Sequence, residues 1–456
     1  MIRNVLIPAL ILFFTVQINA QDWPQYLGPD RNSTSPQENL LQSWPENGPE
    51  VEWTVDLGIG YGGPVVKDGK VYILDRDNEV GDIMRCFDLA SGKELWKYQY
   101  DAAGEVMFPG SRSVPIVDDN HVYSCGPYGD LYCFDVNTHK PVWNKNVWTD
   151  FGGDPGNGPS EGGGGMGGFG GHGNFPTWAI SQCPLIYNDL LILASQAPEA
   201  GVVAYDKITG DLKWKTPSLG AVGYVSPAFV KIDGNDHLVM ITASDRRGSQ
   251  MGNVVGIDPD NGDILWKYDN WNCHIPVPSA TDAGENKVLI TGGYELGATM
   301  IKVVKSANGD YNTEEIFTTE EFGGHTKPPI LYKGYFYSQY GTNSRRDGLV
   351  CMNMEGQIMW KTRRDPNFDK GSMILADGLI LATNGTNILY LIEPDPSGFK
   401  PLASAELLKE RGTGSENDPM ASRVGGAIQN WGPIALAEGK LLIRDQHMML
   451  CVKVAE

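Results

Sequence analysis

Beyond its first twenty residues, the 456-residue sequence has no apolar run long enough to cross a bilayer. Within residues 1–20, Arg3 stands near the start, an apolar run extends from Val5 to Val16, and Ile18-Asn19-Ala20 precedes a polar stretch. This order is typical of a cleavable secretory signal. We therefore expect a soluble protein exported to the periplasm or the medium. No Cys follows the expected cleavage point, so a lipid-anchored form is not predicted.

Positive charge is scarce in this chain. It has 36 Lys and Arg residues against 56 Asp and Glu residues, a formal net charge of −20. Such an excess of negative charge disfavours binding to nucleic acid or to an anionic membrane through bulk electrostatics. The simplest role of this charge is to keep the protein soluble. We expect a monomer whose partner is a protein, a small molecule or a carbohydrate.

Common catalytic signatures are also missing. The sequence has no Gly-x-Ser-x-Gly elbow and no His-Glu-x-x-His zinc motif. Seven Cys in an exported protein could form disulfides. Four of them, however, occupy equivalent places in a repeat and would lie far apart, so we expect buried thiols: Cys86, Cys133, Cys351 and Cys451.

The sequence does contain a repeat built on an Asp followed eight positions later by a Trp. Each copy reads as strand, tight turn and strand, in which the Asp caps the turn, a Gly supplies positive φ and the Trp is buried on the returning strand. A small residue two positions before each Asp is expected to leave room for the indole of a neighbouring repeat. The copies are Asp88 with Trp96, Asp135 with Trp143, Asp206 with Trp214, Asp258 with Trp266, and the shorter Asn353 with Trp360.

A short apolar strand, often with a Pro near its start, opens each repeat, and eight such openings can be counted. Four short strands per unit, separated by turn signals, predict the blades of an all-β, eight-bladed β-propeller. The eighth repeat lacks a Trp-bearing strand, whereas Trp53 lies on an extra strand before the first repeat. The N-terminal strand is therefore predicted to complete the last blade and close the ring.

The predicted organisation is a signal peptide at 1–20, an N-terminal strap at 21–50 and a single propeller at 51–456. A Gly-rich insert at 151–173 interrupts the Trp spacing and reads as a loop, because it has little apolar surface to bury. Helix should be scarce, with Pro401–Arg411 the best candidate.

The repeat Ala/Cys/Gly-x-Asp-x-x-x-Gly-x-x-x-Trp resembles the tryptophan-docking repeat of the pyrroloquinoline-quinone (PQQ) type β-propellers. The stretch from Cys86 to Trp96 matches it except for Cys at the first position, and the resemblance covers about residues 50–456. That family includes quinoprotein alcohol dehydrogenases and non-catalytic scaffolds such as the outer-membrane assembly factor BamB. The repeat indicates the fold and does not separate these branches.

The dehydrogenase branch implies an adjacent Cys-Cys disulfide over the quinone, a Trp beneath it, a Ca²⁺ ion, an Asp base and an Arg near the quinone oxygens. No adjacent Cys pair exists here. Trp178, Trp271 or Trp431 could stack a quinone, and Arg112 or Arg346 could face its carboxylates. PQQ and calcium are thus conceivable but not favoured, and no metal site is predicted. The stretch Asp258–Asp263 resembles a calcium loop in composition, but it is the turn of a repeat and lacks a downstream Glu.

Residues just before each opening strand should surround the propeller axis on one face, because the innermost strand of a blade lines the channel. Each has an ordinary structural explanation on its own, but as a set they predict a polar binding funnel. The predicted funnel residues are Tyr61, Arg112, Trp178, Tyr224, His274, His325, Lys370, Asn430 and Trp431.

These observations favour a binding or assembly scaffold that holds a ligand or partner at the axial funnel. The alternative is a PQQ- and Ca²⁺-dependent dehydrogenase of small alcohols or sugars. A carbohydrate-active enzyme on the same fold is a third reading, although no carboxylate pair stands out to support it. The paired basic loops Arg246-Arg247 and Arg345-Arg346 each adjoin an Asp, which favours locally neutralised turns over an anion site.

Overall fold

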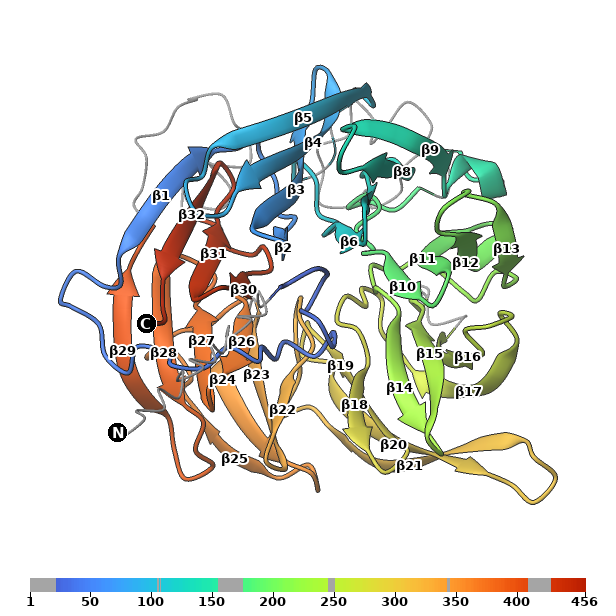
Figure 1. Cartoon of the computed structure of the whole chain (residues 1–456). Helices are drawn as coiled ribbons and strands as arrows, with labels where there is room; N and C mark the ends of the chain where they lie inside the picture. The colour runs from blue at the N-terminus through green and yellow to red at the C-terminus, as the bar shows by residue number, and fades with distance from the viewer. Residues whose placement is uncertain are drawn as a thin grey trace, which may run out of the picture.

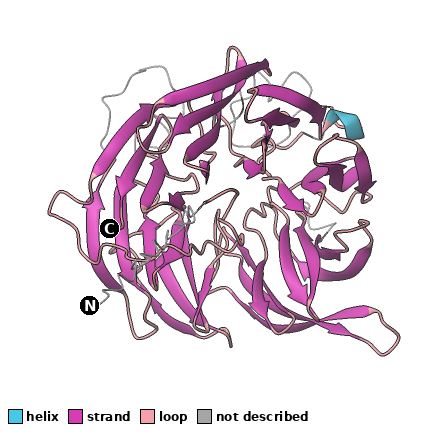
Figure 2. Cartoon of the chain, in the orientation of Figure 1, coloured by secondary structure: helices cyan, strands magenta, loops and turns pink. Residues whose placement is uncertain are grey.

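A computed structural model describes residues 22–104, 106, 108–154, 175–244, 251–342, 345–408 and 428–456. Within these residues, 32 strands form eight four-stranded antiparallel sheets that surround a common axis (Figure 1). The described helix is one turn, η1 (Thr149–Phe151), visible in cyan in Figure 2. The predicted eight-bladed, all-β propeller is therefore confirmed.

The first four blades follow one another along the chain, each running from its inner to its outer strand. Blade 1 is β2 (Val65–Lys67), β3 (Lys70–Asp77), β4 (Gly81–Asp88) and β5 (Glu94–Asp101); blade 2 is β6 (Ile116–Asp118), β7 (His121–Cys125), β8 (Asp130–Asp135) and β9 (Lys140–Asn146); blade 3 is β10 (Leu185–Tyr187), β11 (Leu190–Ala197), β12 (Ala200–Asp206) and β13 (Leu212–Lys215); blade 4 is β14 (Ala228–Ile232), β15 (Asn235–Ile241), β16 (Gly252–Ile257) and β17 (Ile264–Trp271).

The remaining blades continue this order until the last one, whose outer strand comes from the N-terminal side of the chain. Blade 5 is β18 (Thr281–Gly284), β19 (Lys287–Gly292), β20 (Gly297–Lys305) and β21 (Tyr311–Thr319); blade 6 is β22 (Ile330–Tyr332), β23 (Tyr335–Thr342), β24 (Arg345–Asn353) and β25 (Ile358–Lys361); blade 7 is β26 (Met373–Ala376), β27 (Leu379–Thr383), β28 (Ile388–Glu393) and β29 (Lys400–Glu406); blade 8 is β30 (Ala435–Ala437), β31 (Lys440–Arg444), β32 (Met448–Lys453) and β1 (Val51–Asp56).

The repeated Asp caps the turn between the third and fourth strands of a blade. In blade 3, Asp206 Oδ1 accepts hydrogen bonds from the backbone N–H groups of Ile208 and Thr209, both at 3.0 Å. The N–H of Gly210 closes the turn on the Asp206 carbonyl at 2.9 Å. Gly210 has φ +73°, a conformation that most side chains disfavour. The stretch Asp258–Asp263 forms the same kind of turn, as expected.

Several docked Trp residues join their blade to the turn of the next blade, whereas Trp266 donates to His237 of its own blade at 2.9 Å. The Trp143 indole of blade 2 covers Gly210 of blade 3, where an added Cβ would lie 2.7 Å from the ring, and its Nε1 donates to the Lys207 carbonyl at 3.1 Å. Trp214 docks in the same way on Gly262 and donates to the Pro259 carbonyl at 3.2 Å. The repeat thus stabilises the contacts between blades as well as the blades themselves.

The role predicted for the small residue is corrected in one respect. It was expected to admit the indole of a neighbouring repeat, but it pairs with the Trp of its own blade: Cys86 lies opposite Trp96, and Gly256 lies opposite Trp266. A Cβ at Gly256 would lie 2.0 Å from the Trp266 ring. Two adjacent strands carry these residues on the same face, so a large side chain opposite the Trp would displace its ring.

The ring closes as predicted. Strand β1 pairs antiparallel with β32, and Trp53 lies opposite Cys451, nearly 400 positions later. Trp53 also docks across the seam on blade 1, where its Nε1 donates to the Leu89 carbonyl at 2.8 Å. The closing strand therefore belongs to blade 8 and contacts blade 1, which leaves no free edge at this junction.

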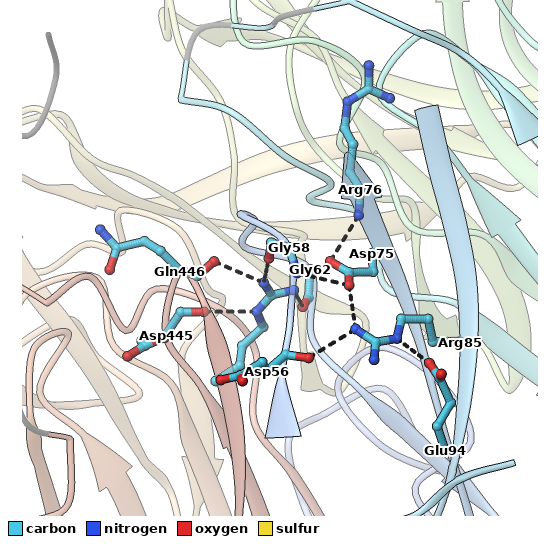
Figure 3. Close-up of polar contacts among 10 residues, drawn as sticks. Asp56, Gly58, Gly62, Asp75, Arg76, Arg85, Glu94, Asp445 and Gln446 are labelled. Atoms are coloured by element: carbon cyan, nitrogen blue, oxygen red, sulfur yellow. Dashed lines mark hydrogen bonds and ion pairs between the residues drawn. The ribbon is translucent and has the colours of Figure 1, made fainter. Parts of the chain in front are cut away.

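Polar contacts hold the same seam near the axis (Figure 3). The buried Arg444 of β31 donates to the Gly62 carbonyl at 3.0 Å and the Gly58 carbonyl at 3.2 Å, both in the segment between β1 and β2. Arg85 of β4 donates to the Asp56 carbonyl at 3.0 Å and pairs with Asp75 at 2.9 Å. These charge-assisted contacts tie the linker after β1 to both blades that it joins.

The N-terminal strap, residues 22–50, crosses one face of the ring from its centre to β1 at the rim (dark blue in Figure 1). Trp23, 2% exposed, exchanges backbone hydrogen bonds with Val66 of β2. Further along, Ser35 donates to the Leu375 carbonyl of β26. The strap is thus ordered against the inner strands of several blades.

Two further predictions concern a helix at Pro401–Arg411 and a loop at 151–173. The helix predicted for Pro401–Arg411 is wrong where the chain is described, because Lys400–Glu406 forms β29, the outer strand that blade 7 needs. For the insert at 151–173, Phe151 is buried, while residues 155–174 lie outside the described residues and the rest of the loop stays a prediction. The segment 1–20, predicted to be a signal peptide, also lies outside them.

Replacement of Trp53 by Ala tests the closure. We expect a loss of about 3–5 kcal/mol in the free energy of unfolding, since a buried indole and its contact across the seam are removed. Trp44→Ala is the matched control: this half-buried Trp of the strap should cost clearly less. Urea unfolding followed by circular dichroism measures both, and equal losses would contradict the special role of Trp53.

The thiols provide a second test of the blade alignment. All seven Cys residues are free and buried, and burial raises the pKa of Cys86, Cys133, Cys351 and Cys451 to about 12. We expect no reaction with Ellman's reagent in the native protein and about seven equivalents after denaturation. Mass spectrometry that finds any two of these four bridged would overturn the alignment.

Candidate functional site

The predicted funnel residues all precede inner strands, and the structure divides them into an axial group and a lateral group. Tyr61, Arg112, Lys370 and Trp431 gather at the axis, whereas Trp178, Tyr224 and His274 surround a separate cleft beside it. The strap contacts the middle of the inner strands at Val66, Val117 and Leu375. It therefore covers the channel from the other end.

The axial group, which we call the aromatic mouth, combines stacked rings with two cations. Tyr61 and Trp431 stack with centroids 5.6 Å apart, and Phe108 packs 6.0 Å from Trp431. The Arg112 guanidinium lies 6.0 Å from the Tyr61 centroid, and the Lys370 ammonium lies 4.8 Å from Trp431. Such contacts hold the cations over the electron-rich ring faces.

Two basic side chains that the sequence analysis did not select extend this positive charge into the channel. The Lys327 ammonium donates to the Trp431 carbonyl at 2.8 Å, and burial lowers its pKa to about 8. From the strap, Arg31 donates to the carbonyls of Pro184 and Pro227, which stand at the start of two inner strands. Neither side chain forms a salt bridge with a carboxylate in the described part of the chain.

His325 and Asn430 lie deeper in the same region. His325 is 7% exposed, its ring packs edge-on to Tyr294 at 4.7 Å, and its Nδ1 has no hydrogen-bond partner among the described residues. Burial, and then the charges of Lys370 and Lys327, lower the pKa of His325 to about 3. Asn430 is 2% exposed, and its N–H donates to the Gly385 carbonyl. His325 is therefore neutral at physiological pH.

In the described part of the chain, one carboxylate contacts the basic side chains of the aromatic mouth. Asp369 pairs with Lys370 at 2.8 Å, and burial is the main cause that raises the pKa of this carboxyl. Among the described residues, the mouth thus combines the basic side chains of Arg112, Lys327 and Lys370 with the carboxylate of Asp369, on a protein whose formal net charge is −20. This arrangement attracts a negatively charged group to the axis.

The lateral group forms what we call the aromatic cleft, a cavity of about 390 Å³ between blades 3 and 4. Trp178 packs edge-on to Tyr224 at 5.4 Å, and its backbone N–H donates to the Tyr224 hydroxyl at 3.3 Å. His274 lies at the rim, where its Nδ1 is 2.9 Å from Ser244 Oγ. The lining is Trp148, Phe175, Pro176, Thr177, Trp178, Gln196, Ala197, Pro198, Ser218, Gly220, Ala221, Val222, Tyr224, His274 and Ile275.

Two residues considered for quinone binding lie elsewhere. Trp271 is 3% exposed and belongs to the hydrophobic core of blades 3 to 5, so its ring faces no open site. Arg346 lines a surface cleft on blade 6 with Lys361, Arg363 and Arg364. Asp347, expected to neutralise the Arg345-Arg346 loop, pairs with Lys361 at 3.0 Å. The loop Arg246-Arg247 lies outside the described residues.

The residues of the mouth fit a quinone and its calcium ion poorly. The Trp431 ring is already stacked on Tyr61, so a flat cofactor would have to displace that contact. Ca²⁺ takes six to eight oxygen ligands. Across the described ranges, no three His, Cys, Asp or Glu side chains are grouped so that they could hold a metal ion. We therefore derive no catalytic step through these groups.

The fold and the channel define a PQQ-type propeller. A family model described as "Outer membrane protein assembly factor BamB" matches residues 79–362, and the chain belongs to this family. Over 438 residues, the chain is also 22% identical to the quinohemoprotein alcohol dehydrogenase ADH IIB of Pseudomonas putida. That match covers 84% of this chain and 58% of the dehydrogenase, so the chain spans well under two thirds of that enzyme's length.

Solved structures of both branches share the fold. BamB from Moraxella catarrhalis superposes with a TM-score of 0.53 at 10% identity and covers 89% of this chain and 99% of its own. The quinohemoprotein alcohol dehydrogenase from Comamonas testosteroni gives a TM-score of 0.59 at 11% identity, with 96% and 81% covered. At such identities these similarities show the fold alone. Separately, no helix of the described residues is long and apolar enough to cross a membrane.

His325 makes the free energy of unfolding depend on pH. Its pKa is about 3 in the folded protein and about 6.5 in an unfolded chain, so the unfolded state takes up the proton first as the pH falls. His325 should therefore destabilise the fold progressively below pH 6.5, by about 2–3 kcal/mol at pH 4.5. His325→Gln should flatten this part of the dependence, as measured by urea midpoints from pH 7 to 4.5. Parallel curves for the two proteins would contradict the assignment.

Proposed function

We propose that the protein is an exported binding or assembly scaffold that holds a negatively charged group of a ligand or partner at the aromatic mouth. The observation that carries this proposal is the cluster of Tyr61, Phe108 and Trp431 under the charges of Arg112, Lys327 and Lys370. Stacked rings offer contact area with little entropy cost, and these half-buried cations attract an anion and orient it.

A protein partner is the first choice for the source of that group. The family description names outer membrane protein assembly, and BamB from Moraxella catarrhalis shares the propeller. The charge of the mouth supports a partner that presents a carboxylate or a short acidic segment. Since the strap covers the other end of the channel, such a segment would enter from the mouth side.

The second candidate is a PQQ-dependent dehydrogenase of small alcohols or sugars, supported by the similarity to quinohemoprotein alcohol dehydrogenases. The stacking of Trp431 on Tyr61 counts against it, and so does the lack of grouped metal-ligating side chains among the described residues. Purified mature protein should therefore show no dye-linked oxidation of alcohols or aldoses after incubation with PQQ and Ca²⁺. Turnover that requires both additions would overturn the scaffold proposal.

Site-specific photocrosslinking tests the scaffold directly. With p-benzoylphenylalanine in place of Phe108, irradiation of intact cells should give a discrete adduct between the protein and its partner. The matched control replaces Leu212 of β13, 45% exposed on the outer side of blade 3, and should give none. Addition of Lys370→Gln to the Phe108 variant should reduce the adduct several-fold, since one cation of the mouth is lost. Equal adducts from positions 108 and 212 would contradict the proposal.

A further inference from the structure

The aromatic cleft differs in charge from the mouth beside it. Among the residues that the structure describes, the fifteen that line it include no Asp, Glu, Lys or Arg. Charged residues make up 20% of the chain, so fifteen residues of average composition would contain about three. A ligand that carries a full charge would find no opposite charge in this lining, and its desolvation would go uncompensated. The cleft therefore suits an uncharged ligand.

The walls of the cleft are aromatic rings held at fixed angles. Trp178 is inclined at 62° to Tyr224, and Trp148 stands at 88° to Phe175 with their centroids 5.6 Å apart. Trp148 is fully buried, whereas Trp178 and Tyr224 are half-buried and so retain exposed surface. This arrangement presents ring surface at the rim on a rigid aromatic base.

Hydrogen-bonding side chains also line the cleft beside these rings. Gln196 is held in place by two contacts with Gly223, whose N–H donates to Oε1 at 2.8 Å and whose carbonyl accepts from Nε2 at 3.3 Å. The exposed His274 uses Nδ1 toward Ser244, and its Nε2 has no partner among the residues that the structure describes. Ser218 at the rim is also exposed. The Nε2 of His274 and the hydroxyl of Ser218 are therefore placed at the rim to hydrogen-bond a polar ligand, whereas Gln196 is already paired with Gly223.

We propose that the aromatic cleft binds a neutral saccharide, one or two pyranose rings of a longer chain. A pyranose has an apolar C–H face that packs on an aromatic ring and a rim of hydroxyls that donate and accept hydrogen bonds without charge. The volume of about 390 Å³ lies in the lower part of the usual range for small-molecule sites, about 300–1,000 Å³. This inference rests on the proposed function, because both place binding on the face of the propeller where the inner strands begin.

Titration of the full mature protein with sugars tests the proposal. The probes are maltotriose, cellotriose and N,N′,N″-triacetylchitotriose as neutral saccharides, trigalacturonic acid as a charged one, and indole as an apolar one. At least one neutral trisaccharide should bind, measured by calorimetry and by a change in Trp fluorescence. Trp178→Ala should weaken that binding about tenfold or more, and His274→Ala should weaken it about threefold. Trp44→Ala, a half-buried Trp of the strap, is the matched control and should bind as the wild type does.

The outcomes separate this inference from the proposed function. Saccharide binding that Trp178→Ala abolishes, in a protein that gives no adduct from position 108, would support the cleft and contradict the partner site. Absence of binding by all three neutral sugars up to roughly 20 mM would overturn the inference, whatever the crosslinking shows. Tighter binding of trigalacturonic acid or indole, or binding unchanged in both Trp178→Ala and His274→Ala, would overturn it too. Circular dichroism of each variant verifies folding, and the exposed position of His274 keeps the test usable if Trp178→Ala unfolds.

Discussion

The docking of one indole on the turn of the next blade is the interaction on which this structure depends. A four-stranded blade has two faces to cover, and no blade can bury them alone. Trp143 and Trp214 each cover a Gly of the following blade and donate to a carbonyl there. Where blade 2 has His139 in place of that Gly, with φ +60°, Trp96 stacks on the imidazole at 5.1 Å instead. The spacing of the repeat therefore sets both the blades and the angles between them.

Closure of the ring extends these contacts between neighbouring blades to the first and last blades, so that they hold the whole propeller together. Trp53 is bound to blade 8 by strand pairing and to blade 1 by docking, so the first and last repeats are held together. A closed ring brings the residues before the inner strands to one end of the axis, although they are spread over almost the whole chain. The strap then covers the other end with Trp23 and directs Arg31 into the channel. The mouth depends on this closure, because Tyr61 before blade 1 stacks on Trp431 before blade 8.

The periodic features could be predicted from the sequence, because they follow from spacing alone. The eight blades, the Asp caps and the pairing of Trp53 with the last blade were of this kind. The position of the nine predicted funnel residues just before inner strands also followed from spacing, while a binding role for them stays a prediction. What could not be predicted is how these residues group. Trp178, Tyr224 and His274 form their own cleft because Phe175 and Trp148 approach from a connection whose path has no periodic signal. Arg31 was missed because the strap lies outside the repeat. Lys327 does precede an inner strand, but only His325 was selected from that segment, and the direction of the Lys327 side chain depends on tertiary contacts.

The central claim is that binding occurs at the mouth end of the channel. Hydroxyl-radical footprinting of the protein in the isolated cell envelope, compared with the purified protein, tests it most directly. The account predicts slower oxidation of Tyr61, Trp178 or Trp431 in the envelope and unchanged oxidation of Trp44 in the strap. Protection confined to Trp44 or to the outer strands, with the mouth oxidised equally in both samples, would contradict it.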